Sequence, residues 1–187
     1  MSALSASTLN TTLSAVNAAT SAARSNAAMS APHQSHDREG VVTVIFRRNP
    51  ADVPQRTVER FASRLQNEVA RGRAFDCLIT GGAELRRLNL KFRGKDETTD
   101  VLSFPSGTGL PACSSLGSIA ISLQRARAQA RAFGHSTEDE IRILMLHGVL
   151  HLTGLDHETD SGRMARAEKH WRARLGLPTS LIERVHA

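Results

Sequence analysis

The sequence of 187 residues has no tyrosine, one tryptophan and two cysteines, and these shortages limit what the protein can be. Cys77 and Cys113 lie far apart and form no Cys-x-x-Cys pair, so we expect neither a disulfide scaffold nor a cysteine-based zinc finger. Free cysteines fit a reducing compartment, and we predict buried structural thiols in a cytoplasmic protein. No stretch approaches the roughly 18 consecutive apolar residues that a membrane-spanning helix requires, which predicts no membrane partner.

Lysine is also scarce, although the chain is basic. There are 24 Lys and Arg against 18 Asp and Glu, a net charge of +6, and the only lysines are Lys91, Lys95 and Lys169. The planar fork of arginine suits phosphate groups, but a compositionally biased genome would give the same excess of arginine. The excess of arginine therefore has two open explanations, a nucleic-acid partner or a compositional bias of the genome.

The first 39 residues differ from the rest in composition. Residues 1–32 are dominated by Ala, Ser and Thr, and Arg24 is their only charged residue. Such a segment has too little apolar surface to offset the entropy lost on ordering. We therefore predict a disordered Ser/Ala-rich extension over 1–39 and a single functional domain over 40–187.

The hydrophobic pattern of the domain predicts an α+β fold. Alternating or β-branched runs indicate four strands, and apolar residues at helical spacing indicate the helices between and after them. The expected strands are 41–46, 74–80, 99–104 and 116–123, and the expected helices begin near 54, 85, 124, 137 and 161. We predict a small mixed sheet of about four strands in a single compact domain, packed by helices that include a buried central helix.

The buried central helix, 141–152, carries two histidines one turn apart. His147 and His151 at positions i and i+4 share one face of the helix, close enough to bind one metal ion. Gly154 then allows the chain to turn, which makes His157 a candidate third ligand. The alternative is a set of hydrogen-bonded core histidines, which becomes less credible with each histidine added at this spacing. Three imidazoles leave a fourth zinc position open for water, as in catalytic sites.

This histidine spacing matches the zinc-protease pattern H-E-x-x-H-x-x-G-x-x-H at every position except one. Position 148 is glycine, where a protease requires a glutamate as its general base. A peptide hydrolase is therefore the weakest of the metal-dependent alternatives. Asp156, next to a candidate ligand, is expected to orient an imidazole.

A second group of candidate residues precedes the third predicted strand. It contains five cations within ten residues: Arg86, Arg87, Lys91, Arg93 and Lys95. The group is either a solvated helix face or an edge that binds the phosphates of RNA. Hydrolysis of a phosphodiester requires a cation near the non-bridging oxygens, which a metal ion and an arginine together would supply.

Three segments closely resemble the YbeY family of bacterial rRNA maturation factors. They are LNLKFRGKDETTDVLSFP (88–105), LGSIAIS (116–122) and HGVLHLTGLDH (147–157), in that order, and the resemblance extends over about 41–177. It implies a metal-dependent, single-strand-specific endoribonuclease that matures the 3′ end of small-subunit rRNA and acts in ribosome quality control. The implied partners are single-stranded RNA, an rRNA precursor and the small ribosomal subunit.

The resemblance also implies the roles of individual residues. One Zn²⁺ per chain would be held by His147, His151 and His157, and Arg93 would be the functional arginine. The sequence departs from the family at Ser118, where an aspartate is usual, and at Phe92, where tyrosine is common. Leu155 is a third departure.

One further alternative and one expectation about specificity follow from the sequence. A ribosome-associated RNA-binding factor with a structural metal would have the same histidines without catalysis. Because aromatic residues make up 4% of the chain, few platforms are available for stacking bases. We therefore expect RNA context or a ribosomal partner, rather than intrinsic base reading, to select the cut site.

Overall fold

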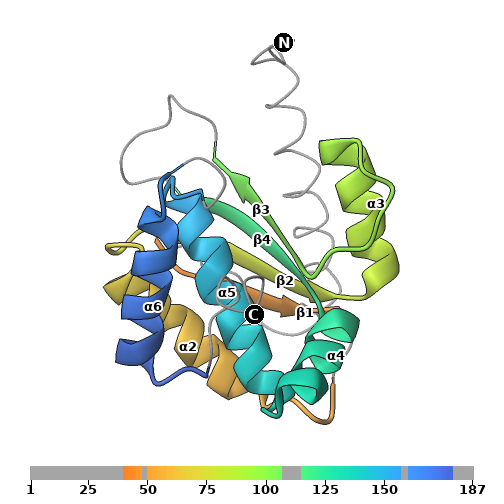
Figure 1. The fold of residues 1–187 in the computed structure, drawn as a ribbon, viewed down its shortest axis with the longest axis horizontal. Coiled ribbons are helices and arrows are strands. Elements are labelled where there is room, and N and C mark those ends of the chain that lie inside the picture. The colour runs from red at the N-terminus through yellow and green to blue at the C-terminus, as the bar shows by residue number, and fades with distance from the viewer. Residues whose placement is uncertain (1–39, 48–49, 107–114, 157–159, 179–187) are drawn as a thin grey trace, which may run out of the picture.

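The computed structural model describes residues 40–47, 50–106, 115–156 and 160–178 (Figure 1). The elements follow one another as β1 (Thr43–Phe46), α2 (Gln55–Glu68), β2 (Asp76–Thr80), α3 (Gly82–Arg93), β3 (Val101–Pro105), β4 (Gly117–Ser122), α4 (Leu123–Phe133), α5 (Thr137–Leu152) and α6 (Arg163–Leu175). Each predicted strand and helix is confirmed, with ends that differ by at most three residues. The predicted extension over 1–39 lies outside the described residues, as do residues 107–114.

The four strands form one mixed sheet in the order β1-β2-β4-β3. β1, β2 and β4 run parallel, with Cys77 of β2 opposite Ile119 of β4. β3 pairs antiparallel to β4, with Leu102 opposite Ala120. The mixed sheet and its helices confirm the α+β prediction.

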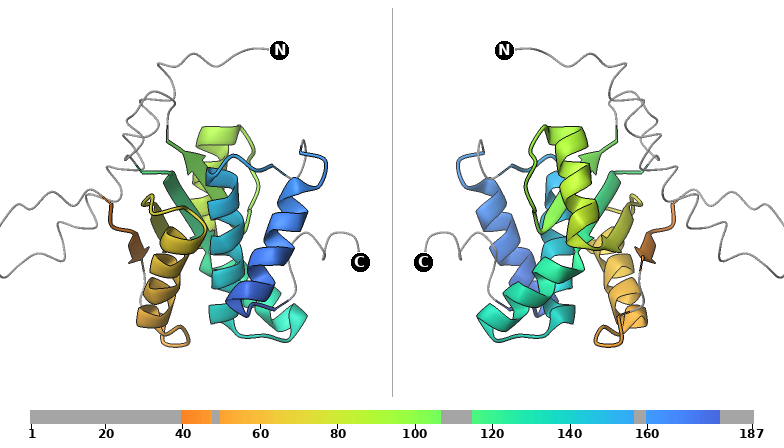
Figure 2. Two further views of the ribbon diagram at one scale, coloured as in Figure 1. Left: turned by 90° about the vertical axis from the view of Figure 1, so that its left-hand side faces the viewer. Right: turned by 90° about the vertical axis from the view of Figure 1, so that its right-hand side faces the viewer.

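The helices cover the two faces of this sheet unequally. Apolar residues of α2 and α5 pack with Cys77, Ile79, Ile119 and Ile121 in the main core. On the opposite face, α3 packs Leu85 and Leu88 against β3 and β4 in a smaller cluster. α6 lies over the outer side of α5, which is enclosed between the sheet and α6 (Figures 1 and 2). This enclosure explains why α5 is apolar on nearly all sides.

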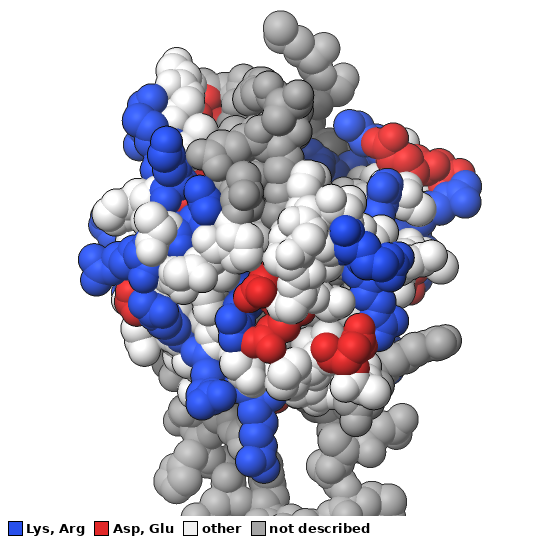
Figure 3. Space-filling model, turned by 60° about the horizontal axis from the view of Figure 1, so that its bottom comes forward, with Lys and Arg blue, Asp and Glu red and all other residues white. Residues whose placement is uncertain are grey.

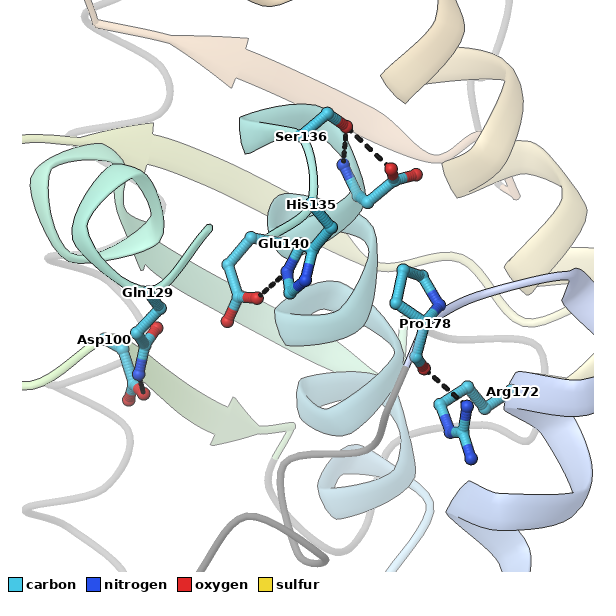
Figure 4. A network of polar contacts seen from close by, with 8 residues as sticks. Asp100, Gln129, His135, Ser136, Glu140, Arg172 and Pro178 are labelled. Carbon is cyan, nitrogen blue, oxygen red and sulfur yellow. Dashed lines mark hydrogen bonds and ion pairs between the residues drawn. The ribbon is translucent and has the colours of Figure 1, made fainter. Parts of the chain in front are cut away.

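The start of α5 is fixed by polar contacts in the turn after α4. Ser136 is the N-cap, and its Oγ accepts a hydrogen bond of 3.0 Å from the backbone N–H of Asp139 (Figure 4). Glu140 does more than complement the helix dipole, because its buried carboxylate pairs with Nε2 of His135 at 2.5 Å. Nearby, Gln129 of α4 donates to Asp100 ahead of β3 at 2.9 Å. These contacts position α5 relative to the sheet.

Among the described residues, no helix combines the length and the apolar composition needed to cross a lipid bilayer.

Candidate metal and RNA site

His147 and His151 lie side by side near the C-terminal end of α5. Their Nε2 atoms are 3.2 Å apart, and their ring centroids are separated by 4.8 Å. His147 is buried and His151 is half-buried. The two imidazoles therefore share one face of the helix, as the i, i+4 spacing predicts.

A glutamate that the sequence analysis did not identify completes this arrangement. Glu168 of α6 is 1% exposed, and its Oε2 lies 3.0 Å from Nδ1 of His147. Because a carboxylate accepts, Nδ1 of His147 donates this hydrogen bond. A carboxylate behind a metal-binding imidazole fixes the tautomer and the orientation of the ring.

The sequence contained a signal for Glu168. On α6 the apolar positions Met164, Trp171 and Leu175 follow a helical repeat, and Glu168 falls on the same stripe. A single carboxylate on an apolar stripe needs a buried partner, because burying an unpaired charge is costly. The identity of that partner, His147, depends on how α6 packs against α5.

The two histidines fit a shared metal ion. Two nitrogens bound to one tetrahedral zinc at roughly 2.0–2.1 Å lie about 3.4 Å apart, close to the 3.2 Å between the two Nε2 atoms. His157, the expected third ligand, lies outside the described residues. Within the part of the chain that the structure describes, no group of three or more His, Cys, Asp or Glu side chains could hold a metal. Asp156 is half-buried, and its N–H donates to Asp160 at 3.3 Å.

Gly148 allows α5 to approach the sheet closely. A Cβ atom at this position would lie 2.9 Å from Cγ2 and 3.0 Å from Cδ1 of Ile119 on β4. The carbonyl oxygen of Gly148 also accepts a hydrogen bond of 3.2 Å from Ser103 of β3. The glutamate of a zinc protease therefore has no space at position 148, because even a methyl group would collide with the sheet.

The basic cluster of α3 is partly neutralised. Arg86 donates two hydrogen bonds of 2.7 Å to Asp96, and these lower the pKa of that carboxyl below its usual value. Arg87 likewise binds Glu84 and lowers its pKa. Of the expected RNA-binding residues, Arg86 and Arg87 are therefore paired with acids.

The remaining cations of the cluster are exposed. Lys91 lies over the ring of Phe92, 5.1 Å from its centroid, and Lys95 follows the end of α3. Arg93 is the last residue of α3, next to Gly94, which ends the helix in the left-handed conformation. The C-terminal end of α3 and that of α5 lie at the same end of the molecule (Figure 1). Arg93 thus lies at the histidine end, although α3 packs on the other face of the sheet.

Two departures from the resembled family lie away from the histidines. Ser118 of β4 precedes Ile119, whose side chain faces α5, so the alternation of a strand directs Ser118 to the opposite face. Phe92 packs edge-to-face on Phe104, with ring centroids 5.2 Å apart. The missing aspartate and the missing hydroxyl therefore leave the His147–His151–Glu168 arrangement intact.

Comparison with known proteins identifies the family of this chain. The sequence model of the family described as Endoribonuclease YbeY matches residues 44–176. A relative named Endoribonuclease YbeY from Solibacter usitatus is 66% identical over 145 residues, covering 78% of this chain and 95% of its own. One of the same name from Koribacter versatilis is 44% identical, covering 76% of this chain and 91% of its own. The solution structure of TM1509 from Thermotoga maritima aligns with a TM-score of 0.49 at 26% identity, covering 71% of this chain and 93% of that one. The chain belongs to the YbeY endoribonuclease family.

Proposed function

We propose that this protein is a zinc-dependent endoribonuclease that cleaves single-stranded RNA, with one zinc ion bound by His147, His151 and His157. The main support is the 3.2 Å separation of the two Nε2 atoms, with Glu168 behind His147. We further propose that its substrate is a precursor of small-subunit rRNA and that it acts in ribosome quality control in the cytoplasm. Family membership supports this part of the proposal.

In this proposal, the site residues have separate roles in holding the metal and in binding the phosphates of RNA. A bound zinc ion would act as a Lewis acid on the scissile phosphate and would lower the pKa of a bound water to about 7. Glu168 holds the ring of His147 in one tautomer. Arg93 is exposed at the histidine end, and we assign it to the non-bridging oxygens of the phosphate. Lys91 and Lys95 would contact the neighbouring phosphates of the strand.

Peptide hydrolysis is not supported, because of how α5 packs. Position 148 lies against Ile119 and has no space for a carboxylate side chain. A phosphodiesterase does not need that base, because protein cations and the metal stabilise the charge that develops on the phosphate.

The deciding experiment measures RNA cleavage and metal content in the same preparations. Wild-type protein should cleave single-stranded RNA, lose this activity with a chelator and regain it when zinc is restored. His151→Ala should lose both metal and cleavage, whereas His170→Ala removes an exposed imidazole of α6 and should leave the metal content unchanged. A metal-depleted wild type that still cleaves would refute the proposal. If RNA binding persists while the zinc-loaded protein cleaves no RNA, the protein is an RNA-binding factor with a structural metal.

Arg93 can be tested separately from the metal. Arg93→Ala should keep its zinc and lose about 10²–10³-fold in cleavage rate, the usual cost of removing one charge-stabilising group. Arg93→Lys should recover only part of the rate, because the charge remains but the two-pronged geometry is lost. Arg131→Ala, which removes an exposed arginine of α4, is the matched control. Equal rates in the Arg93 and Arg131 variants would remove Arg93 from the site.

A further inference from the structure

The outward face of α6 is rich in cations and carries no acid; His170 and Ala173 are its other exposed residues. Met164, Glu168 and Leu175 form its buried stripe, and the exposed side carries Arg163, Arg166, Lys169 and Arg174. Glu168 is the only acid of the helix, and it is buried against His147. Figure 3 shows basic side chains in a band along the side of the molecule on which α6 lies in Figure 1, with acidic side chains nearer the middle of that view.

Three of these cations have no carboxylate within ion-pair distance among the described residues: Arg163, Arg166 and Lys169. Arg174 does have one, because it lies 3.3 Å from Glu68. Arg172, by contrast, donates to the carbonyl oxygen of Pro178 (Figure 4) and to that of Leu177. Asp160, at the start of the helix, accepts a hydrogen bond of 2.8 Å from the N–H of Met164.

The helix dipole and the repulsion between neighbouring charges both disfavour cations at these positions of α6. Arg163 begins the helix, and the first turn contains no acid, although a helix N-terminus stabilises negative charge. Arg163 with Arg166, and Arg166 with Lys169, are like-charge pairs at i and i+3, which repel each other on the helix surface. A bound polyanion would remove both penalties.

The cationic face begins beside the histidine pair. Arg166 and Lys169 flank Glu168 in sequence, and Glu168 contacts His147 directly. α6 starts at the end of the molecule where α5 ends (Figures 1 and 2). With 13 residues, the helix is about 20 Å long, so its outward face leads away from the histidines over the length of several nucleotides.

We propose that Arg163, Arg166 and Lys169 form a track on α6 that binds the sugar–phosphate backbone of the RNA strand beyond the scissile bond. This inference rests on the proposed function, because it gives that site its flanking contact surface. A protein interface usually has an apolar centre, and a membrane-binding helix presents an apolar face to lipid. The outward face of α6 has neither, so RNA is the partner that its charge and its position fit.

The test compares two triple variants with equal loss of charge. Arg163→Gln/Arg166→Gln/Lys169→Gln removes the track. Arg56→Gln/Arg60→Gln/Arg131→Gln removes three exposed cations of α2 and α4 at the opposite end of the molecule. Binding of the full-length, zinc-loaded proteins to a 2′-O-methylated single-stranded RNA of about 12 nucleotides is measured as a function of salt. Because each single-strand phosphate contact contributes roughly 0.7 to the slope of log K against log [salt], the track variant should lower that slope by about 2.

The outcomes separate this inference from the proposed function. The inference requires a smaller slope for the track variant than for the control variant, and recovery of the slope when Arg163→Lys/Arg166→Lys retains the charge. Equal slopes in the two triple variants would overturn the inference, even if wild-type protein cleaves RNA. The partner of the track would then be an anionic protein or lipid. If the slopes differ but zinc-loaded wild type cleaves no RNA, RNA binding by the track is supported and the proposed endoribonuclease function is refuted. Thermal melting of each variant checks that its fold is retained.

Discussion

Replacing Gly148 with alanine tests how closely α5 must approach the sheet. The added methyl group would lie 2.9, 3.0 and 3.2 Å from three side-chain carbons of Ile119. Ile119 is 1% exposed and belongs to the main core, so it has little room to move aside. Either Ile119 leaves its rotamer or α5 moves away from β4.

Two opposing terms determine the size of the effect. Alanine is the better helix former by about 1 kcal/mol. Inserting a methyl group into a packed core costs about 1–3 kcal/mol. Because the contacts lie below normal van der Waals distance and the obstacle is itself buried, we expect the packing cost to prevail. Gly148→Ala should lower the free energy of unfolding by about 1–2 kcal/mol.

A double-mutant cycle isolates the contact with Ile119. Ile119→Ala removes all three opposing carbons and alone costs about 2–5 kcal/mol. In that background Gly148→Ala should become neutral or stabilising, because only the helix-propensity term remains. The coupling free energy should therefore be about 2 kcal/mol, measured by urea unfolding with an unchanged m-value. Ile119→Val, which removes Cδ1 alone, should give a smaller coupling.

The same cycle has a readout at the histidines. If α5 moves away from β4, His147 moves relative to Glu168 on α6, so zinc binding should weaken together with stability. Gly148→Ala that stabilises the wild-type background, or a cycle that is additive within about 0.5 kcal/mol, would refute the packing argument.

Three shorter predictions concern other parts of the structure. Glu168→Gln should weaken zinc binding about 10–100-fold in a calorimetric titration while Glu59→Gln, an exposed control on α2, does not; equal affinities would show that Glu168 has no role behind His147. Ser136→Ala should lower the free energy of unfolding by about 1 kcal/mol because it removes the N-cap of α5, whereas Ser63→Ala on the exposed side of α2 should have little effect; a similar loss in both would argue against the cap. Burial raises the pKa of the Cys77 thiol, so in a Cys113→Ser background Cys77 should react with a disulfide reagent only after unfolding, and fast reaction of the native protein would contradict its burial.

The features that could be predicted from the sequence are those encoded within one segment. Apolar residues on nearly all sides of 141–152 predicted a buried helix, and the i, i+4 spacing predicted that His147 and His151 meet. The helix start predicted near 137 is confirmed, with Ser136 as the N-cap. In each case the contact lies within one turn, where helix geometry alone brings the residues together.

Features that depend on packing between elements could not be predicted. Arg86 is neutralised by Asp96, ten residues later and beyond the turn at Gly94, and a charge count along the chain cannot show that pairing. Glu168 meets His147 only because α6 covers the outer side of α5. His135 meets the carboxylate of Glu140 only through the turn that joins α4 to α5.

Gly148, the two histidines and Glu168 all depend on how α5 is enclosed between the sheet and α6. Imidazoles in the core are tolerated only where their polar atoms have partners, and α5 is enclosed between the sheet and α6. Gly148 brings one side of the helix close to Ile119, and Glu168 on the other side provides the partner for Nδ1 of His147. The same packing that removes a protease base from position 148 therefore holds Nε2 of His147 beside Nε2 of His151. In the proposed function, the cations that contact RNA therefore lie outside α5, at the end of α3 and along α6.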